Sequence, residues 1–379
     1  MRYRRSLAGS LAAMALLAGA APTVAGTFVY VSNAKDGNVA GFALSDDGRL
    51  APLGLSEAAP LVMPMTSATD GSALYAAVRS EPFAVHAWRI DAESGALTPL
   101  GTAPLAANML YLSLDQSGRY LFAASNSSDL ITVNALDEAG RVSDTPVQSV
   151  QTRDYVHAVR TDATNRYLFA PSLGENVVEQ FTFDPATATL AYNAAQTVPL
   201  PEESGPRHFI VSPDNRHLYV VSQFLGVVSA FALDGATGQL TALGDFDGMP
   251  GTRLHPGKKR PPVSSAGPAK PDPEAIWAAD IGITPDGRWL YISERTESRL
   301  IGFARDPESG ALSYLGATDT EQQPRDFAIS PDGAFLIAAG EKSGHIAAYR
   351  IDPESGTLTL RDRQETGAGP AWVEIVRTD

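Results

Sequence analysis

The sequence predicts an all-β fold, a seven-bladed β-propeller of four-stranded blades. A turn such as Ser-Pro-Asp-Gly recurs, followed by a strand such as Leu-Tyr-Val-Ser and then by a second turn of the type Asp-x-x-Ser-Gly. The runs between turns are four to six residues rich in Val, Ile, Leu, Phe and Tyr, which is typical of short strands. No 3.6-residue apolar periodicity of the kind that helical repeats need is present. Seven anchors mark the repeats: Phe28, Leu74, Leu121, Leu168, Leu218, Leu290 and Leu336.

The first segment, residues 1–25, has the pattern of a secretory signal peptide. Basic residues precede a short apolar run that starts at Leu7, and Thr23 and Ala25 are small residues suited to a cleavage site. The run is too short for a transmembrane helix, and no Cys follows it to carry a lipid anchor. We therefore expect an exported, periplasmic protein without a membrane anchor, whose mature chain begins at Gly26.

Composition narrows the function classes. The 379 residues carry 29 basic and 43 acidic side chains, a formal charge of −14, which falls to −17 once the three arginines of residues 1–25 are removed. Such a charge argues against nucleic acid as a partner, since phosphate binding needs a basic face. The absence of Cys excludes disulfides, thiolate metal sites and a Cys nucleophile.

The ends of the mature chain predict how the ring closes. The segment TFVYVS after Gly26 matches the second strand of a repeat, and the C-terminal GPAWVEIV matches a first strand. The last strand should therefore complete the first blade and leave no open sheet edge. Residues 26–379 are then one domain.

The turns follow from local residue chemistry. Pro fixes φ at the first inner position of the Ser-Pro-Asp-Gly turns, and Gly accepts a positive φ at the last. These turns are clearest at residues 212–215, 284–287 and 330–333, and the second turns at residues 91–95, 306–310 and 352–356.

One interval breaks the period. The anchors are 46, 47, 47, 50, 72 and 46 residues apart, so an insertion of about 25 residues lies near residues 247–273. Its Pro, Gly and Lys content predicts a long loop at the end of the ring where blades are joined. It is either a rim over a binding pocket or a tolerated surface insertion.

The repeat also predicts which side chains surround the axis at that end. Three aligned columns lie there, at the start of the first strands and at the end of the second strands. The first holds Met63, Leu110, His157, Arg207, Ala279, Arg325 and Ala371; the next holds His208, Asp280 and Asp326; the third holds Asn33, Arg79, Asn126, Leu173, Gln223, Arg295 and Glu341. Each charged residue alone is readily explained as solvated or salt-bridged, but His157, Arg207 and Arg295 together predict one functional pocket.

Other chemistry has no support in the sequence. There is no Gly-x-Ser-x-Gly elbow, no His-Glu-x-x-His and no glycine-rich phosphate loop before a helix. The six histidines show no metal-ligand spacing, so no metal or other cofactor is expected, and His217 is expected to be structural or exposed.

Four segments resemble the bacterial propeller-type 6-phosphogluconolactonase family, which also includes a fungal carboxymuconate lactonising enzyme. They are GPRHFIVSPDNRHLYVVS, AADIGITPDGRWLYISERT, QPRDFAISPDGAFLIAAGEKSGHIAAYRI and GAGPAWVEI, and the likeness extends over the whole mature chain. The resemblance implies a seven-bladed fold, action on lactones and no metal. It places family residues on His157, Arg207, Arg295 and Arg325, whereas a Glu of the fungal enzyme is replaced here by Gln223.

The resemblance and the export pattern together indicate a periplasmic aldonolactonase of carbohydrate metabolism. The favoured reaction is hydrolysis of D-glucono-1,5-lactone to gluconate, so the expected partner is a small sugar lactone. His157, with a pKa near neutrality, would be the general base, and Arg207 and Arg295 would bind the oxyanion. Substrate hydroxyls would be bound, or the catalytic groups oriented, by His208, Gln223, Asp280 and Arg325.

Two other functions stay open at this point. One is a 6-phosphogluconolactonase, since the arginines suit a phosphate as well as a carboxylate. The other is a non-catalytic binding protein of the cell envelope, because the fold does not dictate function. Nothing in the sequence specifies an oligomeric state.

Overall fold

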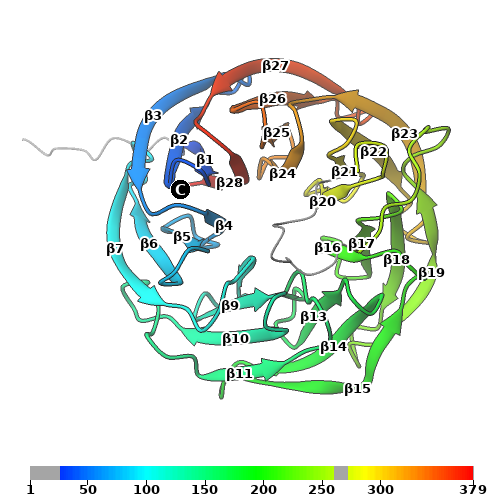
Figure 1. The fold of residues 1–379 in the computed structure, drawn as a ribbon, viewed down its shortest axis with the longest axis horizontal. Helices are drawn as coiled ribbons and strands as arrows, with labels where there is room; N and C mark the ends of the chain where they lie inside the picture. Colours follow the sequence, from blue (N-terminus) through cyan, green and yellow to red (C-terminus); the bar gives the residue numbers. More distant parts are fainter. Residues whose placement is uncertain (1–25, 260–271, 379) are drawn as a thin grey trace, which may run out of the picture.

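The computed structural model describes residues 26–259 and 272–378, and these form a closed ring of seven four-stranded antiparallel sheets (Figure 1). The predicted fold class is confirmed. The predicted signal peptide, residues 1–25, lies outside the described residues.

Each blade is one sheet whose four strands lie side by side, ordered from the axis outward. Blade 1 consists of β28 (Pro370–Arg377), β1 (Thr27–Asn33), β2 (Asn38–Leu44) and β3 (Leu50–Glu57). Blade 2 consists of β4 (Val62–Ser67), β5 (Ala73–Val78), β6 (Ala84–Ile90) and β7 (Leu97–Pro104). Blade 3 consists of β8 (Tyr111–Leu114), β9 (Tyr120–Ser125), β10 (Leu130–Ala135) and β11 (Gln148–Gln151). Blade 4 consists of β12 (Arg160–Thr161), β13 (Tyr167–Ser172), β14 (Val177–Asp184) and β15 (Thr189–Pro199).

The remaining blades follow in chain order. Blade 5 consists of β16 (Pro206–Val211), β17 (His217–Ser222), β18 (Val227–Leu233) and β19 (Leu240–Asp247). Blade 6 consists of β20 (Ala278–Ile283), β21 (Trp289–Glu294), β22 (Arg299–Arg305) and β23 (Leu312–Asp319). Blade 7 consists of β24 (Pro324–Ile329), β25 (Phe335–Gly340), β26 (His345–Ile351) and β27 (Leu358–Glu365).

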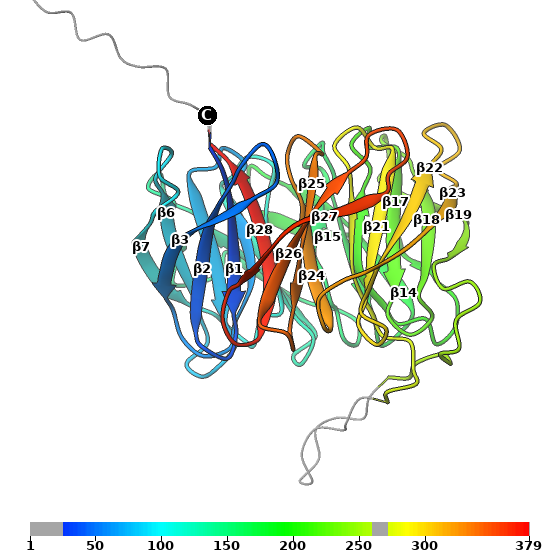
Figure 2. The ribbon, with the colours of Figure 1, turned by 90° about the horizontal axis from the view of Figure 1, so that it is seen from above.

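Ring closure is as the chain ends predicted. β28 is the innermost strand of blade 1 and pairs antiparallel with β1 from Thr27↔Arg377 to Asn33↔Pro370. The C-terminal strand thereby joins the first blade to the last, and Figure 2 shows the described C-terminus at one end of the ring. The apolar core lies between neighbouring blades, and the second strands β5, β13, β17, β21 and β25 are buried along their whole length.

Both kinds of turn form as their residues require. In the first turns a Ser or Thr hydroxyl donates to the Asp two residues later, as in Ser212 to Asp214 and Ser330 to Asp332. The closing glycine has a positive φ, +72° at Gly333. In the second turns the Asp side chain accepts backbone N–H groups, as Asp306 does from Glu308 and Ser309.

Neighbouring blades are also joined by polar contacts at the turns. The Tyr30, Tyr75 and Tyr291 hydroxyls each donate to a glycine carbonyl 65 residues ahead, and the equivalent Tyr219 bond reaches Gly310, 91 residues ahead. The 26 extra residues are the insertion, so the same contact is kept across it.

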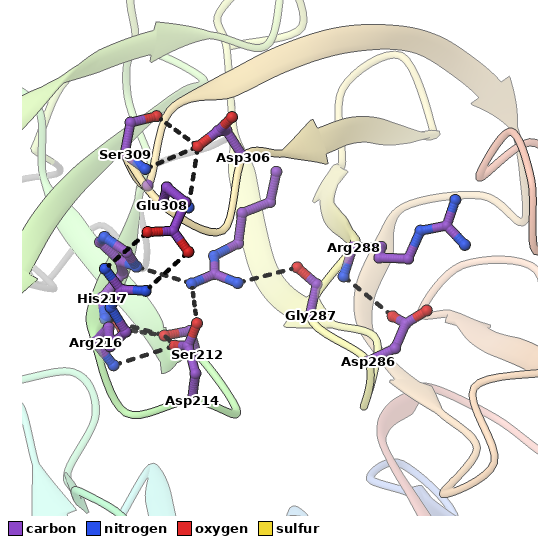
Figure 3. Close-up of polar contacts among 12 residues, drawn as sticks. Ser212, Asp214, Arg216, His217, Asp286, Gly287, Arg288, Asp306, Glu308 and Ser309 are labelled. Carbon is purple, nitrogen blue, oxygen red and sulfur yellow. Dashed lines mark hydrogen bonds and ion pairs between the residues drawn. The ribbon is translucent and has the colours of Figure 1, made fainter.

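An arginine network reinforces this contact between blades 5 and 6. The buried Arg305 guanidinium donates to Asp214 (2.7 Å), to the Tyr219 hydroxyl (2.9 Å) and to the Gly287 carbonyl, and lies 2.8 Å from His217 Nδ1. Figure 3 shows Asp214, His217 and Gly287 converging from the two blades. His217 is therefore structural, and it is buried.

The described arms of the insertion lie at the end of the ring opposite the described C-terminus (Figure 2). Its two described arms are tied to each other, because His255 N donates to the Glu274 carbonyl and Ile276 N donates to the His255 carbonyl. Gly257 N also donates to the Phe224 carbonyl, at 2.7 Å, which attaches the first arm to blade 5. No helix in the described part of the chain is long and apolar enough to cross a membrane.

Candidate active site

A cavity of about 210 Å³ lies on the axis at the insertion end of the ring. We call it the first cavity. Its wall is built from the start of the first strands and the end of the second strands, as the repeat predicted. Seven of its residues belong to the predicted columns: Asn126, His157, Leu173, Arg207, Gln223, Arg295 and Arg325.

Two predicted binding residues do not line this cavity. Asp280 lines a second cavity of about 260 Å³, which is also lined by Ile283, Ile329 and Ile375 near the opposite ends of their strands. His208 lines neither cavity and is buried between them, with its ring 5.5 Å from His157 on one side and 5.1 Å from Tyr111 on another. Of the two roles expected for them, binding substrate hydroxyls or orienting the catalytic groups, this placement favours the second.

Arg207 and Arg295 are held by backbone carbonyls at the ends of strands. Arg207 leaves β16, is 1% exposed, and donates from Nη1 to the Ala279 carbonyl of β20. Arg295 follows β21, and its Nη2 donates to the Ala278 carbonyl at 3.0 Å and to Gln223 Oε1 at 3.1 Å. Gln223 thus orients Arg295 in addition to lining the cavity.

We refer to Arg207, Arg295 and Arg325 as the arginine cluster. Among the described residues none of the three lies within 4.0 Å of a carboxylate oxygen. Buried Nε atoms of Arg207 and Arg325 also have no hydrogen-bond partner. Buried cations without a direct ion pair are costly, so the cluster is suited to bind an anion.

The crowding of like charges is visible in the pKa values. Burial and the neighbouring Arg325 lower the pKa of Arg207 to about 9. Burial, Arg207 and Arg325 lower the pKa of Arg295 well below its ordinary value. An anion bound among these groups would reverse both shifts, since an opposite charge favours the protonated guanidinium.

His157 provides the imidazole of the first cavity. It is 8% exposed, and its Nδ1 has no hydrogen-bond partner. Burial, Arg207 and His208 lower its pKa well below the ordinary value, so the near-neutral pKa expected from the sequence is wrong. The ring is consequently neutral at pH 7 and able to accept a proton, although as a weaker base than expected.

A buried cluster of polar side chains lies behind the arginine cluster. Its members share one aligned column of the repeat, but the alignment does not show that their side chains are in contact. His208 Nδ1 is 2.7 Å from Asp280 Oδ1, and Asp280 and Asp326, which we call the carboxyl pair, lie side by side. Within the described residues, His208 and this pair are the one set of three or more residues whose candidate metal-ligating atoms all lie within 4.8 Å of one another. Sequence spacing could not reveal it, since the three side chains come from three blades.

Sequence reasoning missed four residues of the first cavity: Tyr155, Phe224, Lys259 and Trp277. Tyr155 and Trp277 each stand two residues before a predicted column position. In four other blades the same position has a positive φ, as it does at Tyr155 (61°): Leu61, Gly205, Gln323 and Gly369. This backbone conformation redirects the chain as it enters the first strand. An aromatic residue two positions before the column, as at Tyr155 and Trp277, was the sequence feature that could have indicated these cavity residues.

Lys259 is the cavity residue contributed by the insertion. Its Nζ lies 4.2 Å from the centroid of the Tyr155 ring, a distance at which a cation is attracted to the ring face. Of the two interpretations left open by the sequence, the rim over a pocket is thus supported for the described arm.

Comparison with known proteins agrees with this architecture. A family model described as "Lactonase, 7-bladed beta-propeller" matches residues 24–375. Proteins named 6-phosphogluconolactonase from Pectobacterium carotovorum subsp. carotovorum and Serratia proteamaculans are 35% and 36% identical over 194 and 208 residues. Those matches cover 51% and 54% of this chain and 53% and 56% of the relatives, so the chain spans about half the length of the curated relatives it matches.

A solved structure extends the likeness to the whole ring. The periplasmic gluconolactonase PpgL of Pseudomonas aeruginosa superposes with a TM-score of 0.80 at 26% identity, covering 93% of this chain and 99% of that one. The family match spans all seven blades and the first cavity. The chain therefore belongs to the lactonase family of seven-bladed β-propellers.

Proposed function

We propose that this protein hydrolyses an aldonolactone in the periplasm, with D-glucono-1,5-lactone as the favoured substrate and gluconate as the product. The observation that carries the proposal is the arginine cluster, three cations without a carboxylate partner around a cavity that also holds a neutral, buried imidazole. Lactone hydrolysis generates an oxyanion and then a carboxylate at one carbon, and both match this electrostatic environment.

His157 acts as the general base in this proposal. It takes a proton from a water molecule as the water oxygen bonds to the lactone carbonyl carbon, and it returns the proton to the ring oxygen as the ring C–O bond breaks. Arg207 and Arg295 bind the carbonyl oxygen as it becomes negative, which is worth about 3 kcal/mol for one well-placed donor. Arg325, with its unpartnered Nε, and Gln223 bind the substrate's oxygens or orient the other groups.

The proposed location rests on two supports. The pattern of residues 1–25 is that of an export signal, and the structural neighbour PpgL is named a periplasmic gluconolactonase. Cell fractionation of the full-length chain, together with N-terminal sequencing of the mature protein, tests the location. A product that starts at Gly26 in the periplasmic fraction is the expected result.

A second candidate substrate is a phosphorylated aldonolactone. Besides the arginine cluster, Lys259 lines the same cavity and Arg79 lies near Arg325, and Glu341 is the one acidic residue in the two predicted columns that hold these arginines. This excess of positive charge is larger than one oxyanion requires and suits a phosphate. The relatives named 6-phosphogluconolactonase favour the same candidate.

One assay separates these possibilities. Acid release is followed at constant pH with a panel of neutral and phosphorylated γ- and δ-lactones, above the spontaneous rate. His157→Ala and Arg207→Ala should each lower kcat/KM by at least about 100-fold. Arg216→Ala, which removes an exposed arginine of the blade 5 turn, is the control and should retain activity. Full activity of the first two variants refutes the assignment, and no lactonase activity at all indicates a non-catalytic binding protein.

A further inference from the structure

The two axial cavities differ in charge. The first is lined by the arginine cluster and Lys259, whereas the second is lined by the carboxyl pair and Glu374 together with Arg160 and Tyr111. A cavity lined by cations repels a free proton, and one lined by carboxyl groups accepts it. The ring thus has an anion-binding end and a proton-accepting end on the same axis.

Two buried imidazoles link the cavities: His157 lines the first cavity, and His208 lies between the first and the second. The rings of His157 and His208 are 5.5 Å apart, and each has one buried nitrogen, Nδ1 and Nε2 respectively, without a hydrogen-bond partner. Since neither nitrogen has a partner, the two are not hydrogen-bonded to each other, and proton transfer between the rings needs a bridging water. On the other side of His208, Nδ1 lies 2.7 Å from Asp280 Oδ1. An ionised Asp280 can only accept a hydrogen bond, so it favours the tautomer of His208 with its proton on Nδ1.

The carboxyl pair can hold a proton at this position. Phe327 N donates to Asp280 Oδ2 at 3.2 Å, and Val373 N donates to Asp326 Oδ2 at 2.8 Å, so both groups are fixed by backbone. Burial raises the pKa of both carboxyls, and for Asp326 the neighbouring Asp280 raises it further. Two carboxyl groups in contact share one proton rather than ionise together.

The charged groups around His208 argue against a metal ion at the same place. Arg207, Arg325, Arg160 and Arg295 all disfavour the protonated form of this imidazole, and they would repel a divalent cation more strongly still, because it carries twice the charge of a proton. Two further titratable groups, Glu374 and the Tyr111 hydroxyl, line the second cavity. Burial raises the pKa of Glu374 to about 7. A proton is therefore the favoured occupant of this cluster.

Resting on the proposed lactonase function, we propose that the proton released by hydrolysis leaves the site through His157, His208 and the carboxyl pair into the second cavity. Opening of the lactone forms a C–O bond to the water oxygen and breaks the ring C–O bond. The resulting carboxylic acid then loses its O–H proton, and the electron pair stays on the carboxylate beside the arginine cluster. His208 accepts a proton at Nε2 and gives the Nδ1 proton to Asp280. From Asp280 the proton passes to Asp326 and Glu374, which line the second cavity, and then to solvent. His208, Asp280 and Asp326 are thus positioning and relay residues rather than substrate ligands.

Asp326→Asn tests the relay, because the amide oxygen can still accept from Val373 N while the group no longer titrates. In weak buffer at pH 7 we expect kcat for lactone hydrolysis to fall roughly tenfold with KM unchanged, and a high concentration of imidazole to restore it by carrying the proton instead. Glu374→Gln should show a smaller, equally rescuable fall and covers the case in which the first variant does not fold. Glu179→Gln, a buried carboxyl of β14 bonded to Tyr192, is the matched control and should not depend on buffer.

The outcomes separate this inference from the proposed function. An active wild-type protein with Asp326→Asn and Glu374→Gln equal to it at every buffer concentration overturns the relay alone. A fall in kcat that imidazole does not restore also overturns it, since that result indicates only a structural role. A wild-type protein inactive toward every lactone overturns the proposed function and the relay together.

Discussion

The guanidinium carbon of Arg295 lies 3.7 Å from the centroid of the Trp277 indole ring, and Arg295 Nε donates to the Trp277 carbonyl at 3.1 Å. The last residue before β20 and the first residue after β21 thereby form one unit at the first cavity. A planar guanidinium that is stacked and hydrogen-bonded has little freedom left to lose when a ligand binds.

Arg295→Lys should therefore behave as a severe change. A lysine keeps the charge but cannot stack on Trp277 and bond the Ala278 carbonyl and Gln223 at the same time. We expect kcat/KM for the lactone to fall about 100-fold, with a Tm close to that of the wild type. Steady-state kinetics and calorimetry on the same preparation measure both, and retention of wild-type kcat/KM would remove Arg295 from the mechanism.

Lys259 should discriminate between neutral and anionic lactones. It is exposed, and it reaches the first cavity over the Tyr155 ring. Lys259→Ala should raise KM for a phosphorylated lactone several-fold, with a weaker salt dependence, and leave KM for a neutral lactone unchanged. Lys258→Ala, an exposed neighbour outside the cavity lining, is the control. Equal losses for both lactones would contradict a charge-specific role.

Glu374 should make stability depend on pH. Its pKa is raised from 4.5 to about 7, chiefly by burial, so the folded chain holds this proton to a higher pH than the unfolded chain does. Stability from Glu374 is therefore full below pH 4.5 and is lost as pH rises through 7, by up to about 3 kcal/mol. Glu374→Gln removes this loss, and its Tm relative to the wild type should increase from pH 5 to pH 8 in calorimetric scans. A pH-independent difference would refute the assignment.

The tyrosine bonds between blades should contribute measurably to stability. Tyr291 is buried, and its hydroxyl donates to the Gly356 carbonyl at 2.7 Å. Tyr291→Phe leaves that carbonyl without its partner and should lower the free energy of unfolding by about 1–2 kcal/mol. Tyr314→Phe, at a position 44% exposed, should change it by less than about 0.5 kcal/mol. Urea titrations of both variants compare them directly, and equal effects would show that the bond is not the cause.

Chelation should leave the activity intact. The cluster of His208 and the carboxyl pair is the metal-capable set among the described residues, and four arginines surround it. We expect protein treated with EDTA and dialysed to keep its lactonase rate and its Tm. Loss of either, with recovery on adding one divalent cation, would assign the cluster to a metal ion instead of a proton.

The repeat made much of this architecture predictable. The strand period and the turn residues predict seven four-stranded blades. The chain begins with a second strand and ends with a first strand, which predicts that the last strand closes the ring. These features depend only on local φ preferences and on strand pairing within one blade. The same period places His157, Arg207 and Arg295 at one end of the axis, since equivalent positions of a repeat occupy equivalent places in the ring.

Contacts across the axis depended on the tertiary structure. His208 and Asp280 occupy one sequence column, which indicates a shared level but not which of them lines a cavity. Their side chains meet instead behind Arg207, and the lowered pKa of His157 follows from burial and from cations on other blades. The sequence by itself determined the number of blades, the closure of the ring by its last strand, and which residues lie at the insertion end of the axis. Burial, charge crowding and hydrogen bonding between blades were decided only by tertiary packing, because they depend on distances between residues that no local pattern specifies.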